Sequence, residues 1–232
     1  MSTFKIETQL LRDIFESFQE IYSEIILELK ENGILILGRT PSHTVYMMAR
    51  INDSILQNYT VSQCKKIVFD LTILKKFLSF YPKEVVDVII KRNLIYIGEE
   101  KNFKFYVFAE EEFFDIPELE QISKCDLEKN DLIQSLNELK VFSDFFKLKT
   151  SNGNLELTGE DEIRGQGRIL LNISEVSEKF EGIFPIQPLL IILDNPKIGK
   201  KVNLKFFKNN LIGFSFSKSG SIFNMYIIAH IL

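Results

Sequence analysis

Histidine and cysteine, the residues that most often bind metals or act as nucleophiles, are scarce in this chain. Its 232 residues include two histidines, His43 and His230, and two cysteines, Cys64 and Cys125. None of the four has a second histidine or cysteine at the short spacing that zinc sites use. Two histidines cannot supply a three-histidine zinc site, and we expect both cysteines to be reduced, buried thiols. The sequence therefore predicts no metal centre.

Acidic residues are plentiful but lie in runs that are typical of solvated surface. Examples are Asp161-Glu162 and the run 110–112. General acid–base catalysis needs a sheltered pair of carboxyl groups with different pKa values, and nothing in these runs indicates shelter. The glycine-rich stretch 159–167 lacks the Lys-Ser/Thr of a phosphate-binding loop. We predict that the protein is not an enzyme and needs no cofactor.

Composition is typical of a globular protein. Hydrophobic residues make up 45% of the chain and charged residues 26%, with a formal net charge of −4. No apolar run approaches the roughly 18 residues of a membrane span, and the N-terminus does not resemble a signal peptide. We expect a soluble, cytoplasmic protein with no membrane partner. The negative charge excludes DNA binding through bulk positive charge, unless lysines gather on one surface.

The first half of the chain alternates helix and strand patterns. Apolar residues at three- and four-residue spacing over 10–22 predict an amphipathic helix, whose polar face carries Arg12 with the acidic Asp13, Glu16 and Glu20. A second apolar stripe over 71–81 predicts another helix, which a proline ends. Strands are predicted at 4–8, 25–30, 34–39, 44–51, 65–70, 85–90, 94–98 and 103–109.

The second half shows the same alternation. Asn130 is a candidate N-cap for a helix that continues to Phe142. Residues 189–193 predict a short, fully apolar helix, and the segment 172–184 has no clear pattern. Strands are predicted at 124–128, 145–149, 155–158, 163–172, 202–207, 211–216 and 222–228.

Similar segments recur in the same order in the two halves, about 120 residues apart. The offset is 120 for Asn32-Gly33 with Asn152-Gly153, and the other pairs are 106–109 with 226–229, 71–83 with 188–200, and 91–95 with 208–212. This period is the size of a domain and is too long for a solenoid repeat. We predict two copies of one domain, at 1–109 and 123–232, joined by an acidic connector at 110–122.

The strand alternation around the two Asn-Gly pairs is one residue out of phase. Leu27 and Leu29 are the inward-facing positions before the first pair, and Phe146 and Leu148 before the second. A shift of one residue moves side chains to the opposite face of a strand. At an offset of 120, the second hairpin is therefore expected to differ in length or to contain a bulge.

Four short motifs give the chain a resemblance to a known family. They are Glu31-Asn32-Gly33-Ile34, Pro41-Ser42-His43, Asp115-Ile116-Pro117-Glu118-Leu119 and Tyr226-Ile227-Ile228-Ala229. Together with the duplication they resemble the DNA sliding clamps, most closely the archaeal type of proliferating cell nuclear antigen. The resemblance implies an α+β fold of two similar domains, each with antiparallel β-sheets on the outside and two helices on the inner face.

The resemblance also implies partners. Three clamp subunits, identical or paralogous, form a ring around duplex DNA without reading its sequence. The ring tethers client-motif proteins such as DNA polymerase, flap endonuclease, DNA ligase and the clamp loader. An archaeal-type protein would work in the cytoplasm on the nucleoid, and a eukaryotic one in the nucleus.

In such a ring the polar faces of the helices lie near phosphates and are expected to be basic. Basic residues on or just after the predicted helices are the candidates, against the alternative that they form a solvated face. The residues expected to face DNA are Arg12, Lys75, Lys76, Lys83, Lys140, Lys197, Lys200 and Lys201. The acidic residues of the first helix oppose this role.

A client-peptide site is also implied by the resemblance, beneath the connector. Its residues are expected to be Arg39, His43, Thr44, Val45, Glu118, Leu119, Ile122, Asn210, Leu211, Ala229, His230 and Ile231. An apolar anchor needs an apolar pocket with exposed strand backbone at its rim, and Val45, Leu119 and Ile122 can supply the pocket. His43 can instead be an ordinary turn residue. His230 stands where the family usually has proline.

Subunit contacts are expected where sheets end, because an uncovered strand edge tends to pair. Phe103, Phe105 and Tyr106 lie on the strand expected to end the first sheet. The resemblance implies that this edge pairs with a strand of the next subunit within 163–172, which places Ile169 and Leu171 at the subunit interface.

Two other functions stay open at this point. One is a specialised heterotrimer or checkpoint-type clamp subunit, which the acidic first helix and the altered C-terminus favour. The other is a peptide-binding adaptor that forms no ring and has no role on DNA.

Overall fold

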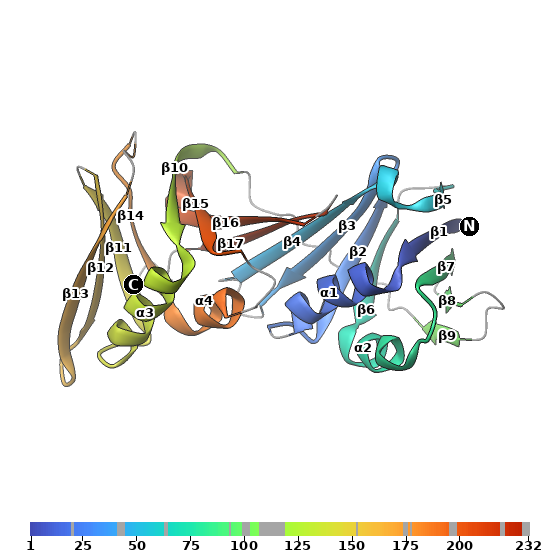
Figure 1. Ribbon diagram of the computed structural model, residues 1–232, viewed down its shortest axis with the longest axis horizontal. Helices are drawn as coiled ribbons and strands as arrows, with labels where there is room; N and C mark the ends of the chain where they lie inside the picture. The colour runs from blue at the N-terminus through green and yellow to red at the C-terminus, as the bar shows by residue number, and fades with distance from the viewer. Residues whose placement is uncertain are drawn as a thin grey trace. The chain divides into compact units, whose positions relative to one another are not determined.

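The structure is a computed structural model (Figure 1). It describes residues 1–19, 21–40, 45–62, 65–92, 94–98, 103–106, 119–151, 153–173, 176, 178–194, 199–218 and 221–228. The chain divides into two compact units, one comprising 1–39, 47–116 and 217–223, and the other 40–46, 117–216 and 224–232.

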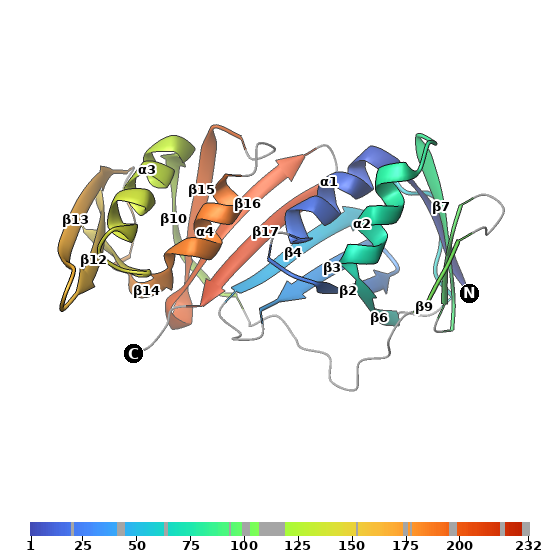
Figure 2. The ribbon, with the colours of Figure 1, turned by 90° about the horizontal axis from the view of Figure 1, so that it is seen from below.

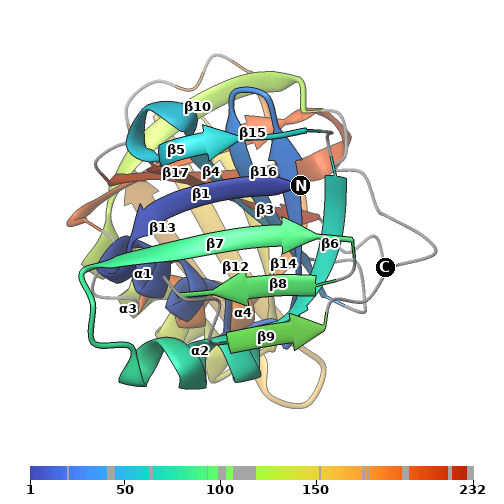
Figure 3. The same ribbon diagram turned by 90° about the vertical axis from the view of Figure 1, so that its right-hand side faces the viewer.

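The first half of the chain consists of antiparallel strands and two helices. Its elements are β1 (Ser2–Glu7), α1 (Thr8–Gln19), β2 (Glu24–Lys30), β3 (Gly33–Arg39), β4 (Val45–Asn52), the 3-10 turn η1 (Asp53–Ile55), β5 (Gln57–Thr60), β6 (Lys65–Asp70), α2 (Leu71–Phe80), β7 (Val85–Lys91), β8 (Leu94–Ile97) and β9 (Phe103–Tyr106). One sheet has the order β5-β1-β7-β8-β9 (Figure 3), and the other strands follow the order β4-β3-β2-β6.

The helices α1 and α2 lie side by side (Figure 2). The apolar stripe of α1 supplies buried residues such as Ile14 and Phe18, both 0% exposed. Helix α2 begins where the Asp70 carboxylate accepts hydrogen bonds from the main-chain N–H groups of Thr72 and Ile73, at 2.8 and 3.3 Å. This N-cap satisfies donors that have no partner within the helix.

The second half has the same kinds of elements. They are β10 (Gln121–Glu128), α3 (Lys129–Lys140), β11 (Phe145–Ser151), β12 (Asn154–Asp161), β13 (Gly165–Asn172), β14 (Glu181–Pro185), α4 (Ile186–Leu193), β15 (Lys201–Phe207), the turn η2 (Lys208–Asn210), β16 (Leu211–Lys218) and β17 (Ser221–Ile228). Strands β13-β12-β11-β14 form one sheet, and the others follow the order β10-β15-β16-β17. Helices α3 and α4 lie side by side (Figure 2).

The two halves share one topology. The order β1-β7-β8-β9 in the first half corresponds to β10-β15-β16-β17 in the second, and β4-β3-β2-β6 corresponds to β13-β12-β11-β14. Each half also places a helix after its first strand and another after its fifth shared strand. Strand β5 is the exception, since it has no counterpart among the described residues of the second half. The arrangement supports the duplication that the sequence predicts.

Equivalent main-chain hydrogen bonds start the first helix of each half. The N–H of Thr8 donates to the carbonyl of Glu84 at 2.7 Å, and the N–H of Lys129 donates to that of Lys200, also at 2.7 Å. Each bond joins the first residue of a helix to the residue immediately before a strand, β7 in the first half and β15 in the second. Both satisfy a helix donor that has no partner within the helix.

The second helix of each half starts in a matching way. The N–H of Leu71 donates to the carbonyl of Ser23, and the N–H of Ile186 donates to that of Asp144, both at 2.9 Å. The acceptor in each case lies just before the second strand of its half. The two halves therefore repeat at the level of single main-chain contacts.

The predicted difference between the two hairpins is wrong. Lys30 pairs with Gly33 across the first hairpin, and Ser151 pairs with Asn154 across the second, so that both loops contain two residues. The structural offset is 121 rather than 120. Gly33 is therefore the first residue of β3, whereas Gly153 lies within its loop, and the two Asn-Gly pairs are not equivalent.

Two local predictions also need correction. Helix α3 begins at Lys129 with Glu128 as its N-cap residue, so Asn130 lies inside the first turn rather than capping it. Helix α1 is shorter than the predicted 10–22, although Tyr22 stays 4% exposed and its N–H donates to the carbonyl of Phe18 at 2.9 Å. Tyr22 thus packs with the helix from just beyond its end.

None of the helices within the described residues is long and apolar enough to cross a membrane.

Candidate functional surfaces

Helix α2 has an exposed face that is basic and partly apolar. Lys75 and Lys76 are exposed on it, and the helix contains no acidic residue. Ile73 and Phe80 are also exposed, at 54% and 78%. Of the predicted DNA-facing positions in the first half, the two lysines on this helix fit the expected chemistry best, since their ammonium groups extend from a rigid element.

Arg12 has a structural role that the sequence did not predict. Its Nε donates to the carbonyl oxygen of Leu78 at 2.8 Å, and its Nη2 donates to the carbonyls of Leu78 and Tyr81 at 2.5 and 2.8 Å. These carbonyls lie at the C-terminal end of α2, where the Leu78 carbonyl also accepts the N–H of the C-cap residue Tyr81 at 3.2 Å. The guanidinium group therefore joins α1 to α2, and its role toward DNA stays a prediction.

The exposed face of α1 is less acidic than the sequence indicated. Asp13 is 3% exposed and accepts a hydrogen bond from Gln9 Nε2 at 2.8 Å. Glu16 is half-buried, and Glu20 lies outside the described residues. One of the three carboxylates that were expected to repel phosphates is therefore buried.

Helices α3 and α4 carry little net charge. On α3, Lys129 and Lys140 are balanced by Asp131 and Glu138. Lys140 Nζ donates a hydrogen bond to the side-chain oxygen of Gln187 on α4. Helix α4 itself contains no charged residue.

The remaining predicted basic residues lie next to the helices rather than on them. Lys83 and Lys200 are exposed, and both precede a strand. Lys201 begins β15, and its Nζ lies 3.8 Å from Glu128 Oε1. Lys197 falls outside the described residues.

Two hydrogen bonds join Thr40 to Val45, the residues on either side of the undescribed segment 41–44. The N–H of Thr40 donates to the carbonyl of Val45 at 3.0 Å, and the N–H of Val45 donates to Thr40 Oγ1 at 3.1 Å. Val45 is 0% exposed, so it offers no surface to a ligand in this conformation. Arg39 is half-buried at the end of β3.

Residues 119–122 lie beside η2, as the predicted client site requires. Gln121 pairs with Phe207, the N–H of Lys208 donates to the carbonyl of Glu120 at 3.0 Å, and the two side chains of Lys208 and Glu120 form an ion pair at 2.5 Å. Leu119 and Ile122 are half-buried and can offer apolar surface.

The other two predicted residues of this region differ in exposure. Asn210 is exposed with a positive φ of 56°, whereas Leu211 is 3% exposed. The remaining predicted client-site residues lie outside the described residues: His43, Thr44, Glu118, Ala229, His230 and Ile231.

Strand β9 is the last strand of its sheet, as predicted for a subunit contact. Its aromatic side chains do not point along the edge. The ring of Phe77 on α2 lies 4.4 Å from that of Phe103 and 5.6 Å from that of Phe105, between ring centroids. Phe103 is still 45% exposed. The side chain of Tyr106 lies outside the described part of the structure.

Strand β13, which carries the other predicted subunit contact, is the last strand of the sheet β13-β12-β11-β14. The N–H of Ile173 donates to the carbonyl of Gly153 at 2.9 Å, which fixes the alternation along β13. Ile169 and Leu171 therefore direct their main-chain groups at β12, and Leu170 directs its own at the outer edge. Leu170 is 54% exposed.

The described residues contain no group of three or more histidine, cysteine, aspartate or glutamate side chains that could hold a metal ion.

A solved structure of proliferating cell nuclear antigen, PCNA, from Thermococcus kodakaraensis matches this chain with a TM-score of 0.78. The match covers 99% of this chain and 100% of that chain, at 15% sequence identity. The chain has the DNA clamp fold. The predicted α+β fold class is thereby confirmed. No family model matches the sequence, and no curated protein matches it.

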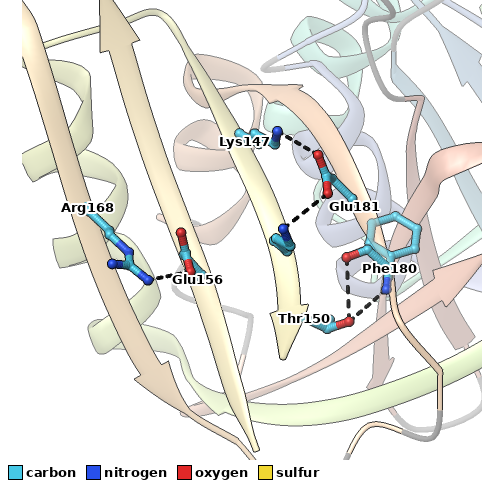
Figure 4. A network of polar contacts seen from close by, with 7 residues as sticks. Lys147, Thr150, Glu156, Arg168, Phe180 and Glu181 are labelled. Carbon is cyan, nitrogen blue, oxygen red and sulfur yellow. Dashed lines mark hydrogen bonds and ion pairs between the residues drawn. The ribbon is translucent and has the colours of Figure 1, made fainter. Parts of the chain in front are cut away.

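One surface of this clamp fold was missed by sequence reasoning. On the outward face of the sheet β13-β12-β11-β14, Glu181 lies 2.5 Å from Lys147 Nζ and 3.6 Å from Lys149 Nζ, and Arg168 Nη2 lies 2.8 Å from Glu156 Oε2 (Figure 4). The alternation of Lys147 and Lys149 along β11 was the available signal, but strand pairing was needed to place carboxylates opposite them.

These ion pairs shift the pKa of their carboxyl groups. The hydrogen bond from Lys147 lowers the pKa of Glu181, and the one from Arg168 lowers the pKa of Glu156. Lys147, Glu181 and Arg168 are exposed to solvent and Glu156 is half-buried, so that each pair contributes modestly to stability.

Proposed function

We propose that this chain is a subunit of a ring-shaped DNA sliding clamp with three subunits, which encircles duplex DNA and tethers enzymes of replication and repair. The observation that carries the proposal is the match to a PCNA along essentially the whole of both chains. A protein that acts by encircling DNA needs its fold over its full length, rather than a few catalytic residues.

Strand edges support the ring. Both β9 and β13 end their sheets, and the outer edge of β13 carries the main-chain groups of Leu170 beside an exposed apolar side chain. Uncovered edges of this kind pair readily with a strand of another chain. In the proposed ring, β9 of one subunit pairs with β13 of the next.

Contact with DNA is proposed to be weak and independent of sequence. Lys75 and Lys76 on α2 would lie near phosphates, with Lys83, Lys140, Lys200 and Lys201 as further contacts. Phosphate contacts position a protein on DNA without reading its bases. A closed ring is retained by topology, so it needs little affinity for the DNA inside it.

Client proteins are proposed to bind beside Leu119 and Ile122. These two side chains supply half-buried apolar surface next to η2, the arrangement that an apolar peptide anchor requires. DNA polymerase, flap endonuclease, DNA ligase and the clamp loader are the client classes expected of such a subunit.

A topological experiment tests the proposal. The protein is loaded by a clamp loader onto nicked circular DNA, the complex is isolated by gel filtration, and the DNA is then cut once with a restriction enzyme. An encircling ring stays on the circle and leaves the linear DNA. Retention on both forms would indicate ordinary DNA binding, and retention on neither, with every clamp paralogue of the source organism present, would refute the ring.

A specialised heterotrimer subunit is the second candidate. The observation that favours it is the low net charge of the helices, since among the four only α2 has a clear excess of lysine. Light scattering separates the candidates. A homotrimer has three times the mass of the chain on its own, a heterotrimer subunit reaches that mass after mixing with paralogues, and a non-ring adaptor stays a monomer in both cases.

A further inference from the structure

Strand β10 is the last strand of its sheet. The main-chain groups of every second residue point away from the sheet and form its outer edge. The hydrogen bond from Lys129 N–H to Lys200 fixes the alternation, so that Leu127 directs its main-chain groups at β15. Lys124 and Asp126 then direct theirs away from β15. The outer edge of β10 is therefore a row of main-chain donors and acceptors that faces away from the sheet.

The equivalent edge in the first half is covered by an extra strand. Strand β5 pairs with β1, and Thr60 lies opposite Thr3 and Gln57 opposite Lys5. Thr8 and Lys129 are both first residues of their helices, so that Thr3 and Lys5 correspond to Lys124 and Asp126. The first half thus shows directly that this edge of the fold accepts another strand.

Side-chain contacts hold β5 in place. The Tyr59 hydroxyl lies 2.6 Å from the carbonyl oxygens of both Lys30 and Gly33, at the first hairpin. The ring of Tyr59 also lies 6.3 Å from that of Phe4 on β1, between centroids. Specific side-chain contacts of Tyr59 therefore hold β5 against the edge of β1 in the first half.

The second half lacks this cover among its described residues. Residues 53–64 join β4 to β6 and contain η1 and β5, whereas the shorter segment 173–180 joins β13 to β14. The described part of that segment contributes no strand to β10. The duplication therefore leaves a strand position beside β10 that this half of the chain does not occupy with described residues.

An acidic cleft lies beside the same strand. It has a volume of about 340 Å³ and is bounded by the second half of β10, the start of α3 and the last residues of β13. Three exposed carboxylates line it, from Asp126, Glu128 and Asp131, with Lys201 as the single basic residue in the lining. The cleft therefore has an excess of negative charge where the side chains of an added strand would lie.

We propose that the outer edge of β10 binds an extended, lysine- or arginine-rich segment of a partner protein, which adds to the sheet as a strand. Main-chain hydrogen bonds to Lys124 and Asp126 would supply the strand pairing, and the cleft carboxylates would select basic side chains at alternate positions. This site is separate from the client region beside Leu119, and its cleft borders the proposed subunit contact through Leu170 and Leu171 of β13.

The experiment uses the full chain and two fluorescein-labelled peptides, one of alternating lysine and valine and one of alternating glutamate and valine. Fluorescence anisotropy is measured at low and at high salt. The basic peptide is expected to bind and the acidic one not to bind, with affinity that falls as salt rises. Equal binding of the two peptides, or no binding of the basic one, overturns the proposal.

Two variants test the two parts of the site. Lys124→Pro removes an outward N–H without loss of a bond to β15, and it is expected to weaken peptide binding about tenfold or more. The double variant Glu128→Gln with Asp131→Asn is expected to weaken binding by roughly fivefold, because exposed ion pairs are individually weak.

A matched double variant is the control for net charge. Glu156→Gln with Glu181→Gln removes the same charge from the outward face of the β11–β14 sheet, and its peptide affinity is expected to be unchanged. Circular dichroism checks that each variant is folded. Affinity that falls equally in both double variants, or that survives Lys124→Pro, shows non-specific attraction and refutes the site. Loss of ring assembly in Lys124→Pro assigns the edge to a subunit contact and equally refutes it.

Discussion

The guanidinium group of Arg12 donates to the main-chain oxygen of Leu78 through two nitrogens, at 2.8 and 2.5 Å. A side chain from the middle of α1 thus satisfies the end of α2, where the helix dipole also favours a positive charge. A residue that the sequence assigns to DNA contact is, in the structure, part of the packing of one helix on another.

Replacing Arg12 with methionine is expected to lower the free energy of unfolding by ~1.5–3 kcal/mol, the range for hydrogen bonds that involve a charged group. Urea denaturation measures the change. Lys75→Ala is the control, since that exposed side chain is expected to alter stability by less than ~0.5 kcal/mol. Unchanged stability in the Arg12 variant would show that the contact with α2 is dispensable.

Gly33→Ala is expected to destabilise the fold more than Gly165→Ala does. Both glycines have positive φ, 131° and 94°, so that alanine is strained at either position by ~1–3 kcal/mol. At Gly33 a Cβ would also lie 2.0 Å from the carbonyl oxygen of Ile51, whereas at Gly165 nothing lies within 4 Å. Thermal unfolding of both variants measures the difference, and equal losses would refute the steric part of the argument.

Strand and helix positions could be predicted from the sequence because they follow from the spacing of apolar residues. The predicted strand 65–70 has the bounds of β6, and α2 falls within the predicted 71–81. Strand β5 could not be predicted in this way, since Gln57 and Asn58 are polar and exposed and the strand forms through pairing with β1.

The details of the candidate sites depended on contacts that no local pattern contains. The helical pattern predicts Asp13 to be a surface residue, yet its side chain is 3% exposed. Val45 was expected to line the client pocket, yet it is 0% exposed. Burial of single side chains depends on what packs over them from distant parts of the chain, which periodicity does not report.

Leu170→Pro is expected to block ring assembly without unfolding the protein. The main-chain N–H of Leu170 faces the outer edge of β13, so proline there removes a donor for the neighbouring subunit and leaves the pairing with β12 intact. Ile169→Pro removes a bond to β12 instead and is expected to lower stability. Light scattering and thermal unfolding separate the two effects, and a trimer that persists in Leu170→Pro would place the subunit contact elsewhere.

Stability is expected to fall in acid partly through Glu181 and Glu156. Their pKa values lie below the ordinary value of 4.5, because Lys147 and Arg168 donate hydrogen bonds to their charged forms. A carboxyl group with a lowered pKa in the folded state contributes stability above its unfolded pKa and loses it as the pH falls through the folded one. Thermal unfolding of Glu181→Gln from pH 7 to about 3 is expected to show a shallower decline than the parent protein. An identical pH dependence would show that the ion pair adds nothing in solution.

Leu119→Ala is expected to weaken binding of a client peptide by about tenfold, as loss of an apolar anchor costs ~1–2 kcal/mol at an interface. Ile163→Ala is the control, because it removes an exposed apolar side chain from the loop between β12 and β13. Calorimetry with a peptide from a client protein measures the affinity, and light scattering confirms the state of assembly. If the Leu119 variant binds normally, the client site lies elsewhere.

The helix starts at Thr8 and Lys129, and at Leu71 and Ile186, share contacts between main-chain N–H and carbonyl groups. Every amino acid except proline carries that donor, and all carry the acceptor, so substitution at these positions leaves the contacts in place. An architecture held in this way tolerates extensive divergence of its side chains. That tolerance explains how a chain can share 15% of its residues with a PCNA and still superimpose on it from end to end.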